Sequence, residues 1–104
     1  MAEGKPYVPP KSELGLVPPE AKMEVGRVYG NGAGKYDFRD WEKDDDHISY
    51  TDMIGAAERH IARWQGGERH DRESGLHPLA HAIARLQMVM TLEMRGIGVD
   101  DRGL

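Results

Sequence analysis

The chain has 104 residues, which is enough for one domain and no more. It contains no cysteine, so disulfide bridges and thiolate metal sites are excluded. Its formal net charge is −4, and its 14 basic and 18 acidic residues are well mixed, which argues against duplex nucleic acid as a main partner. No segment approaches the roughly 18 apolar residues of a membrane span, and no secretory signal pattern opens the chain, so we expect a soluble intracellular protein.

The two ends of the chain lack the apolar periodicity of core structure. Residues 1–17 are rich in proline and predict an extended N-terminal arm, either flexible or wrapped around other structure. Residues 96–104 form a similarly weak tail. Residues 18–95 remain as one helical domain, close to the size at which a single core is marginal without a partner.

The first two helices are predicted from their caps and apolar spacing. The first begins at Pro18-Pro19-Glu20, where proline suits the first turn, and Gly30-Asn31-Gly32 is expected to end it. Ser49 or Thr51 caps the second, which runs to about Gln65 and stops at a glycine pair. The buried stripe expected for this second helix consists of Met53, Ala57, Ile61 and Trp64.

The third helix, from about Pro78 to Arg95, is apolar on two sides. A helix of this kind needs more cover than two neighbours in so short a chain can give, which favours self-association; a central helix in a monomer is the alternative. We therefore expect an all-α fold, a small bundle of three main helices completed by homo-oligomerisation. One stripe consists of Leu79, Ile83, Leu86 and Met90, and the second includes Met88 and Leu92, which we take as interface candidates.

Four of the five histidines fall between residues 58 and 81, where two helices flank a polar loop broken by glycines. Such a loop can hold charged side chains in fixed positions around one cleft, so we interpret it as the floor of a nucleotide site. The alternative is a helical hairpin with a charged surface loop. The candidate residues are Glu58, Arg59, His60, Glu73, His77 and His81.

Several of these candidates also have a structural interpretation. His60 falls on the apolar stripe of the second helix, where a histidine is more often a satisfied core residue than a ligand. Glu73 lies just before the third helix, where the helix dipole favours a carboxylate or a phosphate. Pro78 suits the first turn of that helix, which places His77 near the N-cap and His81 one turn inside.

A second candidate segment, A-G-K-Y-D-F-R-D-W, follows the first helix. Lys35 and the backbone N–H groups of the glycine-rich turn could bind phosphates, and Tyr36 or Trp41 could stack on a base. The alternative, favoured for Phe38 and Trp41, is that the rings pack into the core of the helical bundle. The glycine pattern is not a Walker motif, so this signal alone is weak.

Taken together, four blocks resemble the small phage-type dATP/dGTP diphosphohydrolase family. They are L-V-P-P-E-A, N-G-A-G-K-Y-D-F-R-D-W, A-A-E-R-H-I-A-R-W-Q-G-G-E and D-R-E-S-G-L-H-P-L-A-H-A, and they span residues 16 to about 95. The resemblance implies an α-helical pyrophosphohydrolase, similar in outline to MazG-type enzymes, that converts a purine deoxynucleotide to the monophosphate. It also implies Mg²⁺ or Mn²⁺ and a phage or prophage setting, hence the cytoplasm of a bacterial host.

The chain departs from the MazG-type pattern in its acidic residues. Those enzymes bind metal through E-x-x-E on one helix and E-x-x-D on the next, whereas the second helix here offers only Glu58. A metal would therefore need another set, and we expect Glu58, Glu73 and His81. A set that contains histidine favours Mn²⁺ over Mg²⁺.

The mechanism that we expect is metal-assisted hydrolysis of the nucleotide. The metal would bridge phosphate oxygens and activate a bound water, which His60 or His81 would orient or deprotonate, with Glu58 and Glu73 as metal ligands. Nucleotide binding is assigned to Lys35, Tyr36, Trp41, Arg59 and His77. The competing hypothesis is a non-catalytic, sponge-type protein that binds a nucleotide in the same pocket, and the missing acidic motif is its best support.

Overall fold

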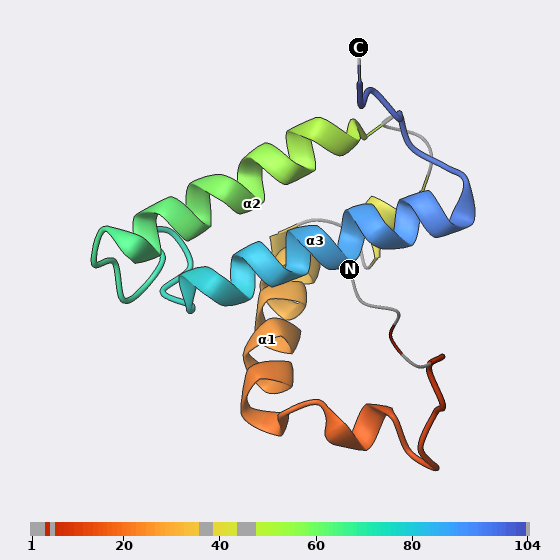
Figure 1. The fold of residues 1–104 in the computed structure, drawn as a ribbon. Coiled ribbons are helices and arrows are strands. Elements are labelled where there is room, and N and C mark those ends of the chain that lie inside the picture. Colours follow the sequence, from red (N-terminus) through yellow and green to blue (C-terminus); the bar gives the residue numbers. More distant parts are fainter. Residues whose placement is uncertain (1–3, 5, 36–38, 44–47, 104) are drawn as a thin grey trace.

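A computed structural model describes residues 4, 6–35, 39–43 and 48–103 of the protein (Figure 1). The described residues form three α-helices, which are α1 (Pro19–Lys35), α2 (Tyr50–Gln65) and α3 (Pro78–Arg95). Two short 3₁₀ turns precede and follow α1, namely η1 (Leu14–Leu16) and η2 (Asp40–Glu42). These residues contain no strand, and the prediction of an all-α fold with three main helices is confirmed. None of their helices is long and apolar enough to cross a lipid bilayer.

The helices are arranged as a hairpin with one crossing helix. Figure 1 shows α2 and α3 side by side and antiparallel, joined at one end by residues 66–77, while α1 crosses at a steep angle. The most extensive contact is between α2 and α3, and α1 packs against α3. Because α3 contacts both other helices, it is the central element of the fold.

The sequence explains the bounds of α2. The Ser49 side chain accepts a hydrogen bond from the backbone N–H of Asp52, which satisfies a donor that has no partner within the helix. Met53 and Ala57 are buried as expected. Trp64 is 44% exposed, so its prediction as a buried residue was wrong. It lies in the last turn of α2, and apolar spacing alone does not show where a helix extends beyond its neighbours.

Helix α3 has the predicted bounds, and its ends follow capping rules. His77 is the N-cap residue, and its Nδ1 accepts a hydrogen bond from the backbone N–H of Leu79 at 3.1 Å. Gly96 ends the helix in the left-handed conformation, with φ of 70°. Ala80 and Ala84 are buried against Val25 and Val28 of α1, and their small side chains allow α1 to approach α3 closely.

Helix α1 continues through Gly30-Asn31-Gly32 to Lys35, so the predicted end of this helix was wrong. Glycine permits the left-handed conformation but does not impose it. None of the glycines of α1 has a positive φ, and the chain keeps its helical path. The extra turn has a functional consequence, because it brings residues 30–33 to the edge of the cleft described below.

The two ends of the chain behave differently. The described residues of the N-terminal arm, 4 and 6–17, are all exposed. The C-terminal segment instead packs on the start of α2, where the Val99 N–H donates to the carbonyl of Ile48 and the Tyr50 N–H donates to the carbonyl of Val99. The Tyr50 hydroxyl also donates to the carbonyl of Ile97 at 2.6 Å. The tail therefore closes the open end of the hairpin.

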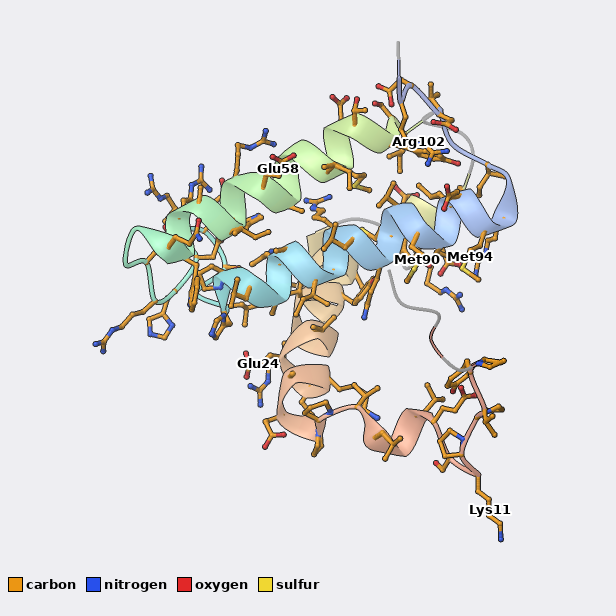
Figure 2. The ribbon with its side chains drawn as sticks, in the orientation of Figure 1. Lys11, Glu24, Glu58, Met90, Met94 and Arg102 are labelled. Carbon is orange, nitrogen blue, oxygen red and sulfur yellow. The ribbon has the colours of Figure 1, made fainter. Side chains whose placement is uncertain are left out.

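The two apolar sides of α3 have different surroundings. Leu92 is 1% exposed and Met88 lines the cleft, so the prediction that Leu92 lies on an exposed oligomer interface was wrong. The large apolar residues of α3 that remain exposed are three members of the other stripe, Ile83, Leu86 and Met90, together with Met94 one turn further on. We call these four residues the outer stripe of α3. Figure 2 shows Met90 and Met94 on the side of α3 that faces away from α2.

Candidate functional site

A cleft of about 1080 Å³ lies between α2 and α3 and is bordered by the C-terminal half of α1. The turn around Trp41 and the loop residues 71–74 complete its walls. A volume of this size is sufficient for a nucleotide. The cleft thus unites five segments of the chain. Its residues divide into a histidine cluster, a set of arginines and an aromatic end.

Two histidines from different helices stack at the loop end of the cleft. His60 of α2 and His81 of α3 have ring centroids 4.7 Å apart and ring planes inclined by only 14°. Both side chains are largely buried, with 14% and 11% of their area exposed. The stack joins the two arms of the hairpin and places two proton-transferring groups next to each other.

Asp71, in the loop between α2 and α3, lies beside both rings and is buried, with 7% exposure. Its Oδ2 accepts hydrogen bonds from the backbone N–H groups of Glu73 and Ser74, at 3.1 and 2.9 Å. The Ser74 hydroxyl lies 3.1 Å from the same oxygen and 2.7 Å from His81 Nε2. The second oxygen, Oδ1, is 3.7 Å from His60 Nδ1. One buried carboxylate is therefore shared between the loop backbone and the two histidines.

The surroundings of this cluster lower the pKa of both His60 and Asp71, for different reasons. Burial lowers the pKa of His60, and the neighbouring His81 lowers it further, while Asp71 partly opposes these effects. Burial acts to raise the pKa of Asp71, but the backbone N–H groups of Ser74 and Glu73 and the Ser74 hydroxyl outweigh it and the pKa is lowered. Asp71 is thus an anion at neutral pH and His60 a neutral imidazole, the state that a general base requires.

Five arginines line the cleft, and they differ in their ion pairs. Arg39 pairs with Glu42 at 2.7 Å, and Arg72 lies 3.5 Å from Glu68. In the part of the chain that the structure describes, no ion pair includes the other three, which are Arg59, Arg63 and Arg85.

The three arginines without an ion pair among the described residues come from the two helices that carry the histidine pair. Arg59 and Arg63 are one turn apart on α2, where two like charges destabilise a helix by about 0.2–0.5 kcal/mol. Arg85 projects from α3, and its Nη1 has the sulfur of Met53 as a weak partner at 3.7 Å. The positive charges of Arg63 and Arg85 contribute to the lowered pKa of His60. An anionic group in the cleft would offset part of this positive charge.

The other end of the cleft is aromatic and apolar. Trp41 and Tyr29 have ring centroids 6.1 Å apart with planes inclined by 46°. The Tyr29 hydroxyl donates to Gln87 Oε1 at 2.9 Å, which fixes its ring against α3. Met88 and Ala84 border the same region. A flat aromatic ligand would find a ring surface here, at the end away from the loop.

The structure brings together some of the predicted site residues and not others. Trp41, Arg59, His60, Glu73 and His81 all line the cleft. Glu58 is exposed on α2 outside the cleft, as Figure 2 shows, and His77 caps α3 outside it. Tyr36 and the side chain of Lys35 lie outside the described residues.

Sequence reasoning missed four residues of the site. Arg63 and Arg85 were not assigned to the site, and Asp71 and Ser74 were overlooked because their role depends on how the loop folds back on itself. A partial signal was present, since D-x-x-S followed by glycine favours a side-chain-to-backbone turn. Asp71 and Ser74 form this turn, which the Gly75 N–H closes by donating to the Asp71 carbonyl at 2.8 Å.

The expected Mg²⁺ or Mn²⁺ would need a set of ligands that face one another in the cleft. Among the described residues, no group of three or more His, Asp or Glu side chains is arranged to hold a metal ion. Glu73 and His81 line the cleft, but Glu58, the third expected ligand, does not. The described residues therefore do not fit a resident metal, and we derive no chemical step through one.

This fold and cleft define a small all-α domain whose cleft is lined by a histidine pair and by arginines that lack an ion pair among the described residues. Comparison of the sequence with known families assigns this domain to one of them. The chain belongs to the family described as "dATP/dGTP diphosphohydrolase, N-terminal", which matches residues 2–102. A protein named dATP/dGTP diphosphohydrolase from Salmonella phage PMBT28 is 32% identical over 92 residues.

The match to the phage protein covers 88% of this chain but only 30% of the relative. This chain thus spans less than a third of the length of that protein. No solved structure matches the chain.

Proposed function

We propose that the cleft binds a purine nucleoside or deoxynucleoside di- or triphosphate and that the protein hydrolyses it to the monophosphate. The observation that carries this proposal is the set of unpaired arginines, Arg59, Arg63 and Arg85, around the stacked histidines. Three guanidinium groups suit the several negative charges of a polyphosphate, to which arginine binds through paired hydrogen bonds. Family membership and the name of the phage relative support the nature of the ligand.

The cleft suggests an orientation for the nucleotide. The phosphates would lie at the arginine end, beside His60 and His81, and the base would lie against Trp41 at the aromatic end. His60 would accept a proton from the water that attacks a phosphorus atom, and the arginines would stabilise the charge that develops on the phosphate oxygens. The phosphoanhydride bond breaks, and the nucleoside monophosphate leaves as one product.

A second candidate function is nucleotide binding without turnover. It is supported by the share of the phage relative that the chain covers, because the 70% of that protein outside the match could carry part of its activity. The lack of a ready metal-ligand trio among the described residues is in line with this candidate. Both candidates use the same cleft, and they differ only in the fate of the nucleotide.

The test is incubation of the purified protein with the common ribo- and deoxynucleoside di- and triphosphates, each with Mg²⁺, with Mn²⁺ and with a chelator. Chromatography should show monophosphate from a purine nucleotide, and comparison with the chelator shows whether turnover requires an added ion. The Arg63→Gln variant, purified in the same way, controls for contaminating phosphatases. Tight retention of an unchanged nucleotide would favour the binding candidate, and neither binding nor turnover would refute both.

We also propose that the protein self-associates through the outer stripe of α3, as a soluble assembly in the bacterial cytoplasm, where nucleotide substrates occur. Its four apolar side chains follow one face of the helix at spacings of three and four residues and remain 38–79% exposed. Burial of such a stripe against a second copy would remove apolar surface from water without changing the cleft.

The outer stripe can be tested separately from the core of the same helix. Met90→Glu should lower the mass measured by light scattering to that of the 11.7 kDa chain while the helical circular dichroism is kept. Leu92→Glu is the contrasting variant, because it places a charge at a buried position and should unfold the protein. A wild-type mass equal to the monomer at micromolar concentration would refute self-association.

A further inference from the structure

Asp71 is the one buried charged residue among those that the structure describes, and its two oxygens face two different histidines. We infer that Asp71 is a positioning residue that fixes opposite tautomers in the stacked rings, with the proton on Nε2 in His81 and on Nδ1 in His60. His60 Nε2 is then the nitrogen that accepts a proton during turnover. The assignment of this last role rests on the proposed function, whereas the two tautomers follow from the contacts alone.

The tautomer of His81 follows from a count of protons on Ser74. A hydroxyl has one hydrogen to donate and can accept two. The Leu76 N–H donates to the Ser74 oxygen at 3.1 Å, which occupies one accepting position. Asp71 Oδ2 also receives two backbone N–H groups and, as a carboxylate oxygen, can only accept, so the Ser74 hydrogen points to it.

With its single hydrogen given to Asp71, the Ser74 oxygen has only an accepting position left for His81 Nε2 at 2.7 Å. Nε2 must therefore be the donor in this contact and must carry a hydrogen. In the neutral ring the lone pair is then on Nδ1. His81 is held by the loop through a specific hydrogen bond, and Ser74 is not available as a nucleophile.

The tautomer of His60 follows from electrostatics. Its Nδ1 is buried from solvent, has no hydrogen bond and lies 3.7 Å from Asp71 Oδ1. A lone pair on Nδ1 would face a negative oxygen in a buried site, whereas an N–H would face it favourably. The hydrogen of the neutral ring is thus on Nδ1, and a small approach of the ring would turn the contact into a hydrogen bond.

The arrangement has a consequence for the reaction that the cleft is proposed to catalyse. When water attacks phosphorus, its O–H bond breaks and the proton moves to His60 Nε2, which makes His60 an imidazolium. The positive ring remains beside Asp71 Oδ1 and stacked on His81. Asp71 stabilises the charged form of His60, which burial alone would keep neutral. A buried carboxylate has the same effect on the general base of serine hydrolases.

The tautomers can be read directly by ¹⁵N NMR of the imidazole rings of the labelled protein, at a pH where both rings are neutral. We expect a protonated Nε2 with an unprotonated Nδ1 in His81, and the reverse in His60. Ser74→Ala should leave His81 without its acceptor and shift its spectrum towards a mixture of tautomers. Ser74→Thr keeps the hydroxyl and should restore the wild-type pattern.

Asp71→Asn gives the sharpest outcome. The amide oxygen can still accept the two backbone N–H groups, which leaves the NH₂ group where Oδ1 stood, facing His60 Nδ1. An NH₂ group donates, so Nδ1 should become the acceptor and the His60 tautomer should invert. If the protein turns over nucleotide, kcat should fall by about 10–100-fold with a smaller change in KM. Should this variant fail to fold, the wild-type and Ser74 spectra still decide the tautomers.

The outcomes separate this inference from the proposed function. His60 carrying its hydrogen on Nε2, or His81 carrying its hydrogen on Nδ1 alone, would overturn the inference even in an active enzyme. The expected tautomers in a protein without any turnover would support Asp71 as the positioning residue and would count against the proposed hydrolysis instead.

Discussion

One aspartate closes each end of the α2–α3 hairpin, Asp71 at the loop end and Asp101 at the tail end. The difference between them distinguishes a carboxylate that only holds the fold from one that also faces the cleft. At the tail end, Asp101 Oδ1 accepts the Thr51 N–H at 3.0 Å, and its Oδ2 accepts the hydroxyls of Ser49 and Thr51. At the loop end, Asp71 Oδ2 has a corresponding set of backbone and hydroxyl donors. Its Oδ1, however, faces a histidine of the cleft.

A lowered pKa does not distinguish these two carboxylates, because both have one. Both also organise the chain around them through N–H and O–H donors. What distinguishes them is the oxygen that the local backbone leaves unused. Both oxygens of Asp101 accept hydrogen bonds from the start of α2, whereas Oδ1 of Asp71 faces His60. A carboxylate that the fold satisfies only in part is therefore the better candidate for a role in chemistry.

The largest expected difference between the two ends concerns turnover. Asp71→Asn should lower kcat by about 10–100-fold, because it removes the partner of the histidine pair. Asp101→Asn should change kcat by less than about threefold, because the tail end lies outside the chemistry. Steady-state kinetics of both variants with the best purine nucleotide measures this contrast, and equal losses would remove the functional distinction between the two aspartates.

A second expected difference concerns the tolerance of the backbone, since each end contains a glycine with positive φ. Gly75 at the loop end has φ of 74° and open space around an added Cβ, so Gly75→Ala should cost about 1–2 kcal/mol. Gly98 at the tail end has φ of 81°, and an added Cβ would lie 2.9 Å from the Tyr50 ring and 3.1 Å from the Ile48 carbonyl.

Gly98→Ala should therefore destabilise the protein clearly more than Gly75→Ala, because strain and a backbone clash add together. Urea unfolding followed by circular dichroism measures both free energies of unfolding. A loss for Gly98→Ala equal to or smaller than that for Gly75→Ala would show that the tail does not hold α2 as tightly as its hydrogen bonds indicate.

The smallest expected effects are two separate windows of acid destabilisation. Burial lowers the pKa of His60, so the folded protein takes up this proton later than the unfolded chain, and stability should fall as the pH drops below about 6.5. The hydroxyls of Ser49 and Thr51 lower the pKa of Asp101 to about 2. Its contribution is present above the unfolded pKa and should be lost as the pH falls from about 4 through 2.

Thermal melts between pH 7.5 and 2 of the wild type, His60→Gln and Asp101→Asn can separate these windows. His60→Gln should flatten the upper window alone, and Asp101→Asn the lower window alone. A wild-type melting temperature that stays constant between pH 6.5 and 5 would contradict the assignment of the upper window to His60.

The sequence predicted those features of the fold that depend on local chemistry. The start of α3 followed from His77-Pro78, and the start of α2 followed from its Ser49 cap. The end of α1 could not be predicted in this way, because a glycine does not reveal whether it will adopt the left-handed conformation that it permits.

The site was predicted only in part, for a related reason. Its histidines were recognisable because they cluster in the sequence and fall on the inward sides of two amphipathic helices. Asp71 was overlooked because its importance arises from contacts with Ser74 and His60, which exist only after the loop has folded. The lack of ion-pair partners at Arg63 and Arg85 is likewise a property of three-dimensional neighbours and has no signature in a single sequence.

The most direct test of the nucleotide cleft is the affinity for a nonhydrolysable dGTP analogue, measured by calorimetry for the wild type, the double variant Arg63→Gln/Arg85→Gln and the control Arg69→Gln. Arg69 is exposed and does not line the cleft. Removal of two guanidinium groups should weaken binding by about 100-fold or more, since each hydrogen bond to a charged group contributes about 1.5–3 kcal/mol. The control should bind like the wild type, and an unchanged Kd in the folded double variant would contradict the assignment of the cleft to a nucleoside polyphosphate.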